Sequence, residues 1–426
     1  MTTHDTAFQF AAANIRFGSG ITREVGDDLV DLEARRTMVV IDPVLRDSQT
    51  GETVIAALRL AKVDFDVFDR VVVEPTDTSF QEASSFARAG KFDSFVAVGG
   101  GSTIDTAKAA NLYSTHVADF FDFVNAPIGR GLPVPGPLRP LIAIPTTAGT
   151  GSETTGVAIF DYVEKRAKTG IAHRYLKPTL GIVDSDNTRT LPPAVAASAG
   201  LDVLSHALES YTAIPYTSRP KPGRPLERPA YQGCNPVSDI WALRALELVD
   251  EFLQRAVDDP SDTEARGKML FAAAIAGMGF GNAGVHLPHG MSYPVAGMVR
   301  SFRPEGYRVD HPLVPHGMSV ILHTPAVVRF TASACPERHL QAARALGADV
   351  DDVPPEDAGV VLADRVIQFM QTTGMPNGLK AVGYSEADIP ALVEGTRPQH
   401  RVTKLSPRPA GPEELAALFR ESLTIW

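Results

Sequence analysis

Cysteine is nearly absent from this chain, because Cys234 and Cys335 are the only two among its 426 residues. Two cysteines cannot form a disulfide framework, and their scarcity is typical of proteins from a reducing compartment. Also lacking is any apolar run near the roughly 20 residues that a membrane-spanning helix needs. The N-terminal stretch MTTHDTAFQF has neither the apolar core of a signal peptide nor the arginines of a transit peptide. We therefore expect a cytoplasmic protein with no membrane partner.

An excess of basic residues is lacking too, since the formal net charge is −10 at pH 7. The chain offers no overall positive charge to nucleic acid or anionic lipid, and we expect no nucleic-acid partner. The hydrophobic fraction of 44% and the charged fraction of 21% are ordinary for a globular protein. A chain of 426 residues is too long for one ordinary domain, which predicts two domains with separate cores.

Short apolar runs alternate with helical patterns over the first 190 residues. The runs expected to be strands are TMVVID (37–42), DFDVFDRVVV (64–73), FDSFVAVGGGS (92–102) and PLIAIPTT (140–147). The helical stretches between them lie at about 51–62, 79–90 and 103–112. Such alternation is typical of a parallel sheet covered by helices, and it predicts an α/β dinucleotide-binding domain over residues 1–190.

Strand patterns are nearly absent after residue 190, where helical periodicity takes over. Helical patterns are found at 194–213, 239–257, 263–277, 325–330, 339–346 and 357–371. Two irregular stretches interrupt them, 215–236 with six prolines and 298–315 with several basic residues. Residues 191–426 are therefore predicted to form an all-α domain.

A glycine-rich turn joins an expected strand to an expected helix at Gly99, Gly100, Gly101 and Ser102. Glycine lets the backbone approach a pyrophosphate closely, and the helix N-terminus offers free N–H groups. Asp105, in the first turn of that helix, is expected to cap local N–H groups or to meet a nicotinamide amide. The dinucleotide fingerprint G-x-G-x-x-G is lacking here, and three glycines after a strand also occur in ordinary turns.

A second turn of small hydroxyl residues, 146–153, follows another expected strand and strengthens the cofactor interpretation. Thr146 and Thr147 are expected to donate hydrogen bonds to phosphate, ribose or carboxamide. Asp42 ends the first strand, where a carboxylate accepts from the 2′-hydroxyl of NAD and repels the 2′-phosphate of NADP. The sequence thus favours NAD, although Asp42 also suits a solvated turn before a proline.

A carboxylate and an imidazole lie four residues apart at Asp202 and His206 in a helical pattern, hence on one face of the helix. Alone, such a pair more often forms a structural hydrogen bond. The tetrapeptide His-Gly-Met-Ser, however, occurs twice, beginning at His289 and at His316, and each copy opens a mainly apolar segment. We therefore predict that Asp202, His206, His289 and His316 hold one metal ion.

One carboxylate and three imidazoles suit Fe²⁺, Mn²⁺ or Zn²⁺, and these residue types do not select among the three. An open coordination position would take a substrate hydroxyl and make it more acidic. His286 and His311 lie close in sequence to the expected ligands, whereas the remaining histidines are interpreted as surface or core residues.

These motifs together resemble the iron-dependent (group III) alcohol dehydrogenase superfamily over nearly the whole chain. The matching stretches are Gly-Gly-Gly-Ser-x-x-Asp at 99–105, Pro-Thr-Thr-Ala-Gly-Thr-Gly-Ser-Glu at 145–153, and Asp-x-x-x-His at 202–206 with the two later histidines. The resemblance implies the fold shared by iron-containing alcohol dehydrogenases and dehydroquinate synthase, with an NAD(P)-binding α/β domain, a helical metal-binding domain holding Fe²⁺ or Zn²⁺, and hydride transfer. It implies metal ligands at the four residues named above, and dinucleotide contacts at Asp42, Gly101, Ser102, Thr146, Thr147, Thr155 and Lys168.

Within the superfamily the chain most closely resembles the hydroxyacid–oxoacid transhydrogenase family, through the stretches 233–243, 279–298, 309–319 and 382–396. That resemblance implies oxidation of 4-hydroxybutyrate to succinate semialdehyde, reduction of 2-oxoglutarate to 2-hydroxyglutarate, and NAD(H) retained as hydride carrier. Two departures from the wider superfamily are shared with this family. Tyr293 stands where many members have a histidine linked to proton relay, and the segment 299–314 is longer than usual. Tyr293 or His286 is the expected proton relay.

Three arginines, Arg300, Arg303 and Arg308, lie with His311 between the third and fourth expected ligands. Arginine binds carboxylates in a bidentate manner, which predicts that these arginines bind small hydroxy-acid and oxo-acid substrates. The alternative is a solvated basic loop. The alternative functions are a conventional NAD-linked, metal-dependent alcohol or hydroxy-acid dehydrogenase and a catalytically silent nucleotide-binding protein. Self-association into a homo-oligomer is also expected.

Overall fold

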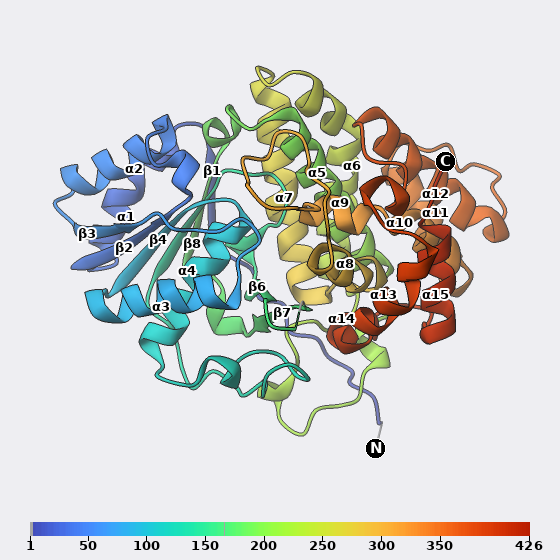
Figure 1. The fold of residues 1–426 in the computed structure, drawn as a ribbon, viewed down its shortest axis with the longest axis horizontal. Coiled ribbons are helices and arrows are strands. Elements are labelled where there is room, and N and C mark those ends of the chain that lie inside the picture. The colour runs from blue at the N-terminus through green and yellow to red at the C-terminus, as the bar shows by residue number, and fades with distance from the viewer. Residues whose placement is uncertain (1–2, 166) are drawn as a thin grey trace. The chain divides into compact units, whose positions relative to one another are not determined.

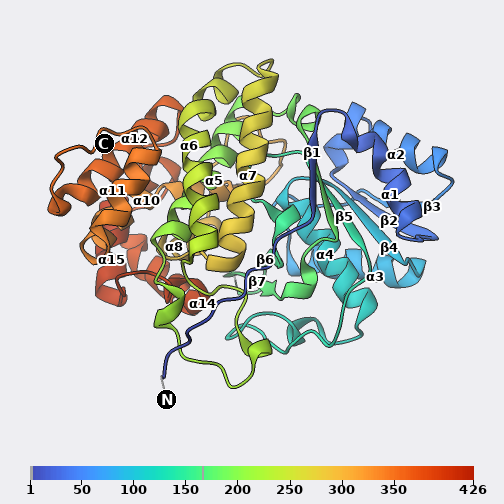
Figure 2. The same ribbon diagram turned by 180° about the vertical axis from the view of Figure 1, so that it is seen from behind.

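The computed structural model describes residues 3–165 and 167–426, drawn from two sides in Figure 1 and Figure 2. The chain forms two compact units, one of Ala12–Leu191 and one of Pro192–Trp426 together with the N-terminal segment up to Ala11. The division falls where the sequence changes from strand–helix alternation to helices alone. The N-terminal segment, expected with the α/β domain, belongs to the helical unit.

A parallel sheet of six strands forms the centre of the first unit (Figure 1). Its order is β1-β8-β5-β4-β2-β3, and each neighbouring pair is parallel. The strands span Ile15–Gly18 (β1), Arg36–Ile41 (β2), Asp64–Phe68 (β3), Ser94–Gly99 (β4), Leu141–Pro145 (β5) and Leu180–Asp184 (β8). The expected α/β architecture is confirmed.

Both faces of the sheet are covered by helices. The helices are α1 (Val25–Asp31), α2 (Gln49–Leu60), α3 (Asp77–Gly90) and α4 (Gly101–Thr115). Val39 and Ile41 of β2 pack in one core with α1 and α2, whereas Met38 and Val40 pack in another core with α3 and α4. Successive side chains of a strand point to opposite faces, so a sheet buried on both faces has apolar residues at every position.

Of the four predicted strands, three are confirmed as β2, β4 and β5. The strand in the run 64–73 is shorter than predicted, because β3 ends at Phe68, which forms the last residue pair with β2 at Val40. The sequence did not predict β1, β8 or the antiparallel hairpin of β6 (Val157–Tyr162) and β7 (Ala167–Ala172). β1 has only four residues, which is too short for a recognisable period, and β8 has five residues in an apolar run that was not singled out.

The three predicted cofactor segments lie at the carboxyl ends of neighbouring strands. Asp42 follows β2, Gly99 ends β4, and Thr146 follows β5. The main-chain N–H of Asp42 donates to the carbonyl of Val98, and that of Thr146 donates to the carbonyl of Gly99, both at 3.1 Å. Ligands of open α/β sheets bind in the crevice outside this edge. The sheet order therefore gathers the three segments where a nucleotide would bind.

Glycine is required where the two glycine-rich turns touch each other. A Cβ atom on Gly101 would lie 2.6 Å from Cγ2 of Thr150, and one on Gly100 would lie 3.0 Å from Oγ1 of Thr147. Helix α4 begins at Gly101, and no side chain caps its first N–H groups. Its uncapped donors and its dipole suit a phosphate group.

A buried lysine fastens the second turn to α4. The Nζ atom of Lys108 donates to Oγ of Ser152 at 2.6 Å and to the carbonyl of Val157 at 2.8 Å, and lies 3.6 Å from Oδ1 of Asp105. Burial lowers the pKa of Lys108 to about 8, against the attraction of Asp105. Asp105 also accepts from Ser152 Oγ and from the Ile159 N–H. The carboxylate of Asp105 is thus engaged inside the unit, and the N–H group that it binds belongs to Ile159 of β6 (Val157–Tyr162), not to its own helix.

Helices form the second unit. They are α5 (Pro193–Thr212), α6 (Pro236–Asp258), α7 (Thr263–Ala283), α8 (Leu287–Gly297), α9 (His316–Ile321), α10 (Thr324–Thr331), α11 (Pro336–Ala345), α12 (Ala358–Thr372), α13 (Ile389–Thr396), α14 (His400–Thr403) and α15 (Pro412–Glu421). The predicted helical segments are confirmed as α5, α6, α7, α10, α11 and α12. No strand lies in the described part of this unit.

Five helices of this unit were not predicted, and α8 shows why. Every residue from Leu287 to Val295 is buried, so no alternation of apolar and polar residues marks the helix, and Pro294 lies inside it. Among the described residues, no single helix is long and apolar enough to cross a membrane. In the part of the chain that the structure describes, one pair of helices, α7 and α8, passes that test together, and the pair is bent by 105°.

The proline-rich stretch 215–236 is irregular, as predicted, apart from short 3₁₀ turns, and 298–315 is irregular as well. The N-terminal segment is bound to the proline-rich stretch 215–236 by ion pairs. Asp5 is buried and forms ion pairs with Arg219 at 2.9 Å and with Arg228 at 2.8 Å. These contacts explain why the N-terminal segment belongs to the helical unit.

We predict that Lys108→Met lowers the free energy of unfolding by roughly 3 kcal/mol, because it leaves the buried carboxylate of Asp105 without its cation. Thermal unfolding measures the effect, with the exposed Lys165→Met as the matched control in the same unit. An unchanged unfolding midpoint for Lys108→Met would show that this network does not hold the turn.

Candidate metal centre

Helix α5 presents two of the four predicted ligands on one buried face. Asp202 and His206 stand one helical turn apart, and their exposed fractions are 2% and 4%. The Nδ1 atom of His206 lies 3.7 Å from Oδ2 of Asp202. The ring of His206 stacks on Phe280 of α7, with centroids 4.0 Å apart and planes inclined by 7°. This stacking fixes the orientation of the imidazole.

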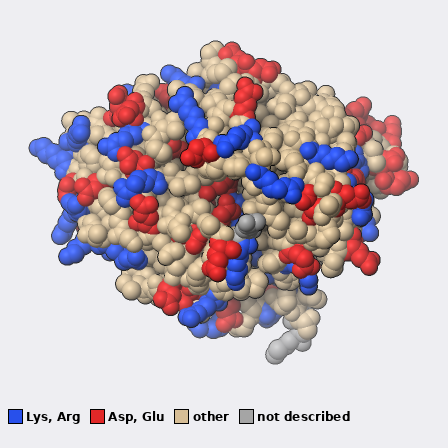
Figure 3. All heavy atoms as spheres, in the orientation of Figure 1, with Lys and Arg blue, Asp and Glu red and all other residues tan. Residues whose placement is uncertain are grey.

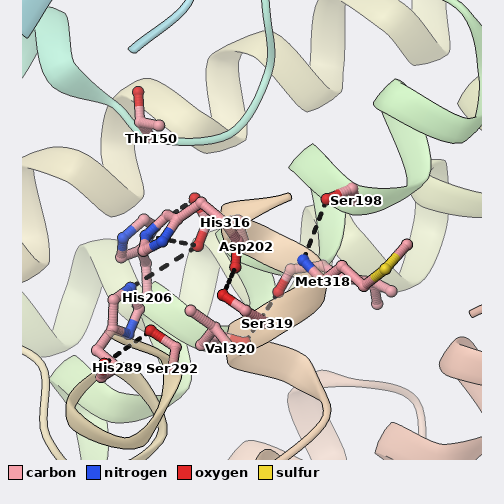
Figure 4. A network of polar contacts seen from close by, with 12 residues as sticks. Thr150, Ser198, Asp202, His206, His289, Ser292, His316, Met318, Ser319 and Val320 are labelled. Atoms are coloured by element: carbon pink, nitrogen blue, oxygen red, sulfur yellow. Dashed lines mark hydrogen bonds and ion pairs between the residues drawn. The ribbon is translucent and has the colours of Figure 1, made fainter. Parts of the chain in front are cut away.

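The other two predicted ligands lie against Asp202 (Figure 4). Nε2 of His289, in α8, lies 3.7 Å from Oδ1 of Asp202, and Nε2 of His316, the first residue of α9, lies 3.8 Å from the same oxygen. One ligand atom from each of the four residues falls within 4.8 Å of the others. The structure therefore brings together all four residues that the sequence singled out.

The spacing of these atoms fits a shared metal ion better than direct bonding. Separations of 3.7 and 3.8 Å are too long for hydrogen bonds. Two ligand atoms on one tetrahedral ion with bonds of about 2.1 Å lie roughly 3.4 Å apart. Nε2 of His289 is buried and has no hydrogen-bond partner among the described residues. A divalent cation would satisfy this nitrogen and neutralise the carboxylate.

The repeated His-Gly-Met-Ser has a structural explanation. In each copy the serine hydroxyl donates to the carbonyl of the histidine three residues earlier, Ser292 to His289 and Ser319 to His316, both at 2.7 Å. Such a bond ties each ligand residue to the first turns of its own helix. Figure 4 shows both serines beside the cluster.

The glycine of each copy allows another helix to come close. A Cβ atom on Gly317 would lie 2.0 Å from the carbonyl oxygen of Ser198 and 2.9 Å from Cβ of Asp202. Similarly, a Cβ atom on Gly290 would lie 2.5 Å from Cγ2 of Thr403 in α14. Glycine therefore brings α9 onto α5 and α14 onto α8, and the first contact sets the separation of His316 from Asp202.

Glu209 is a site residue that the sequence analysis missed. It is 1% exposed, and its Oε1 atom accepts a hydrogen bond from Nδ1 of His289 at 2.6 Å. Its Oε2 atom accepts from the main-chain N–H of His286 at 2.6 Å. A carboxylate only accepts, so the ring proton of His289 resides on Nδ1 and its Nε2 is left bare to face Asp202.

Burial alone would raise the pKa of Glu209, but the charge and hydrogen bond of His289 lower it on balance. Burial likewise works against charge on His289, and Glu209 and Asp202 together raise its pKa. Glu209 lies three residues after His206, on the same face of α5. That helical spacing was visible in the sequence, whereas the partner 80 residues away in the chain was not.

Access to the centre is uneven. The side chain of His316 is 23% exposed, whereas those of Asp202, His206 and His289 are 2–5% exposed. A small molecule would therefore reach the four ligand atoms from the side of His316.

The two predicted proton relays differ in their surroundings. His286 is buried, its Nε2 lies 3.0 Å from the hydroxyl of Thr212, and that hydroxyl donates to the carbonyl of Leu208. Burial lowers the pKa of His286 to about 4, so the ring is neutral at neutral pH. Its hydrogen bonds end at a main-chain carbonyl, which favours a structural role. Tyr293 is also buried and interacts with Arg401.

The three arginines predicted to bind substrate lie at exposed positions of the irregular stretch 298–315. Arg300 is already paired with Asp388 at 2.7 Å, and Arg303 donates to the carbonyl of Asp310 at 2.8 Å. Basic side chains commonly lie beside acidic ones on the face drawn in Figure 3. The contacts of Arg300 and Arg303 therefore fit the alternative of a solvated basic loop. For Arg308, its exposure is the one observation that agrees with substrate binding.

Several predicted cofactor residues are engaged within their own unit. Lys168 is buried and pairs with Glu74 at 2.5 Å and with Asp161 at 3.1 Å, which together raise its pKa against the effect of burial. Oγ1 of Thr155 accepts from Lys108 at 3.4 Å. Oδ1 of Asp42 accepts from the Val44 N–H at 2.9 Å, and burial raises the pKa of Asp42.

The chain belongs to the iron-containing alcohol dehydrogenase family. Residues 12–185 match the family described as "Iron-containing alcohol dehydrogenase", and residues 229–423 match "Fe-containing alcohol dehydrogenase family, C-terminal". It is thus a metal-dependent oxidoreductase that acts on hydroxyl groups. Over all of its length it is 56% identical to the hydroxyacid-oxoacid transhydrogenase of Bos taurus, covering 91% of that protein. It is 52% identical to the probable hydroxyacid-oxoacid transhydrogenase of Dictyostelium discoideum, over 99% of this chain and 80% of that protein.

These relatives overturn one expectation from the sequence. The names of the curated relatives from cattle, frogs, rodents, apes, human and Dictyostelium all include "mitochondrial". The expectation of a cytoplasmic protein is therefore wrong. It rested on missing targeting patterns and scarce cysteine, and scarce cysteine indicates a reducing environment without saying which compartment supplies it.

Solved structures share the fold over the whole chain. A 1,3-propanediol oxidoreductase superposes with a TM-score of 0.85 at 27% identity, covering 98% of this chain and 100% of that one. A sulfoacetaldehyde reductase from Bifidobacterium kashiwanohense, solved in complex with NAD⁺, superposes with a TM-score of 0.80 at 27% identity, covering 99% and 100%. The predicted fold class is confirmed.

We predict that Glu209→Gln weakens metal binding roughly 10- to 100-fold, because the neutral amide no longer holds the Nδ1 proton of His289 as firmly. Competition with a chelator of known affinity measures the dissociation constant. The control is Glu247→Gln on the exposed side of α6, which should bind metal like the unmodified protein. Equal affinity in both variants would show that Glu209 does not orient His289.

Proposed function

We propose that the chain is a hydroxyacid–oxoacid transhydrogenase, which moves a hydride from a hydroxy acid to an oxo acid. The observation that carries this proposal is 56% identity over the whole chain to the Bos taurus enzyme of that name. The cluster of one carboxylate and three imidazoles supports it, because an electrophile at the hydroxyl favours oxidation of the carbon that bears it.

Asp202, His206, His289 and His316 would hold the metal, which we propose to be Fe²⁺, with Zn²⁺ as the alternative because raw affinity favours zinc. When bound, the ion supplies Lewis-acid chemistry toward the substrate hydroxyl. Glu209 holds the proton of His289 on Nδ1, and the partly exposed His316 marks the side from which substrate enters.

NAD is the proposed cofactor, and it supplies the hydride acceptor and donor when bound. A related reductase at 27% identity has been solved with NAD⁺, and the carboxyl edge of the sheet offers the uncapped N-terminus of α4. We assign the pyrophosphate to the turn at Gly99, Gly100, Gly101 and Ser102, and the adenine ribose to Asp42. The remaining proposed contacts are Thr146, Thr147, Thr155 and Lys168, with Asp105 as a support of the turn.

The proposed substrates are 4-hydroxybutyrate and 2-oxoglutarate. The carbinol carbon of 4-hydroxybutyrate loses a hydride and its oxygen loses a proton, which gives succinate semialdehyde. C2 of 2-oxoglutarate gains a hydride and its oxygen gains a proton, which gives 2-hydroxyglutarate. No NAD(H) is consumed, so retained cofactor suffices. Tyr293 is the proposed proton carrier, in preference to the enclosed His286. A homo-oligomer remains a prediction.

The alternative is a conventional NAD-dependent dehydrogenase of the same fold. The names of the two solved relatives favour it, since one is an oxidoreductase of 1,3-propanediol and the other a reductase of sulfoacetaldehyde. The two functions differ in whether a second organic substrate takes the hydride.

We predict that 4-hydroxybutyrate dideuterated at C4 delivers one deuterium to C2 of 2-hydroxyglutarate, without dilution by solvent and with only trace NAD present. Mass spectrometry of the 2-hydroxyglutarate measures the transfer, and initial rates should follow a ping-pong pattern. Turnover that requires stoichiometric NAD⁺ and is indifferent to 2-oxoglutarate would instead identify a conventional dehydrogenase.

We predict that Asp202→Asn loses its stoichiometric metal and lowers kcat/KM roughly a thousandfold, because the one anionic ligand is gone. Metal content and turnover are measured on the same preparations. His311→Gln, at a ring that is 44% exposed, should change neither. Retention of one metal per chain in Asp202→Asn would place the metal elsewhere.

A further inference from the structure

The proposed substrates share a carboxylate, so a cation is needed near the metal centre to recognise it. The arginines of 298–315 fit that role poorly, because Arg300 is paired with Asp388 and Arg303 with a carbonyl of its own loop. Another arginine, Arg401, lies in α14, which packs against α8, the helix that carries His289, and it had no expected role from the sequence.

Packing of α14 against α8 puts Arg401 there. The glycine that follows His289 leaves no side chain between the two helices, and a Cβ atom on Gly290 would meet Thr403 at 2.5 Å and Val402 at 3.5 Å. Both of these residues follow Arg401 directly in α14. The charge of Arg401 reaches His289, whose pKa it lowers slightly against the larger effects of Glu209 and Asp202.

Two tyrosines hold the guanidinium of Arg401. Its Cζ atom lies 5.0 Å from the ring centroid of Tyr231, and its side chain hydrogen-bonds with Tyr231 and Tyr293. Tyr231 comes from the proline-rich stretch 215–236, and Tyr293 from α8, one turn beyond His289. Gly284 permits this approach, because a Cβ atom there would lie 2.9 Å from Cβ of Tyr231.

Arg401 differs from most arginines that stack on an aromatic ring in this protein. The others commonly also pair with a carboxylate, as do Arg36, Arg70, Arg255, Arg300, Arg338 and Arg365. Within residues 3–165 and 167–426, Arg401 interacts with the two tyrosines and with no carboxylate at ion-pair distance. As a whole residue, Arg401 is only partly buried. A cation of this kind, oriented but without an anion, suits a ligand carboxylate.

We propose that Arg401, oriented by Tyr231 and Tyr293, binds the carboxylate of the hydroxy-acid and oxo-acid substrates. This assignment rests on the proposed function, since it presumes carboxylate substrates. It gives the proline-rich stretch a role, because that stretch supplies Tyr231. It also replaces Arg300, Arg303 and Arg308 as the basis of specificity.

The test compares 4-hydroxybutyrate with 4-hydroxybutyramide, a neutral substrate of the same length, on the metal-loaded, full-length protein. We expect Arg401→Gln to lower kcat/KM for the acid roughly 10- to 100-fold more than for the amide, with the difference mostly in KM. Arg401→Lys should restore part of the preference, since it keeps the charge and loses the bidentate geometry. Inhibition by butyrate and by butyramide repeats the comparison without turnover.

The matched control is Arg408→Gln, since Arg408 also stacks on a ring, that of Phe330 at 4.1 Å, but lies exposed. Equal losses for acid and amide in Arg401→Gln, or a lowered unfolding midpoint with lost metal, would assign Arg401 a structural role and overturn the inference. A full preference for the acid in Arg401→Gln would overturn it as well, with the proposed function intact. If the unmodified protein does not distinguish the acid from the amide, both the proposed substrate class and the role of Arg401 are wrong.

Discussion

The buried polar face of α5 constrains the whole helical unit. Asp202, His206 and Glu209 lie on this face almost without solvent, and a carboxylate in such a place is costly unless it is paired. His289 faces both carboxylates. Its Nδ1 atom is hydrogen-bonded to Glu209, and its Nε2 atom is turned toward Asp202. The distances from Asp202 to His206, His289 and His316 are 3.7 to 3.8 Å, so a cation shared with the three imidazoles would balance its charge.

Packing around this face follows from the need to hold four ligand atoms together. Gly317 lets α9 rest on α5, Gly290 lets α14 rest on α8, and the stacked Phe280 fixes the ring of His206. The serines of the repeated tetrapeptide tie each ligand histidine to its own helix. Ligand geometry is therefore set by close contacts at two glycines, by one stacked ring and by hydrogen bonds to main-chain carbonyls. The contact of α14 with α8 at Gly290 also brings Arg401 close to the helix that carries His289.

The sequence predicted the four ligands because their signal is local. Asp202 and His206 are separated by one helical turn, and the other two begin identical tetrapeptides, so no knowledge of tertiary contacts was needed. Glu209 and Arg401 lacked such a signal, since each acts through a contact with a residue far away in the chain. The ion pair of Arg300 lacked a local signal for the same reason, because its partner Asp388 is 88 residues distant.

In the fold, too, some elements could be predicted from local sequence patterns and others could not. Strands with long apolar runs, such as β2 and β4, were recognisable, and so were the amphipathic helices α6 and α12. The four-residue edge strand β1 and the wholly buried α8 carry little periodicity, and only the sheet order and the helix packing reveal them. The turns predicted to bind the cofactor lie near one another because the strand order places β2, β4 and β5 side by side.

X-ray absorption spectroscopy of the metal-loaded protein, compared with the His289→Ala variant, tests the central claim most directly. A single ion bound by Asp202, His206, His289 and His316 predicts outer-shell scattering from three imidazoles and a light-atom first shell, with one imidazole fewer in the variant. A spectrum without imidazole scattering, or one that His289→Ala leaves unchanged, would contradict the claim that these four residues form the metal centre.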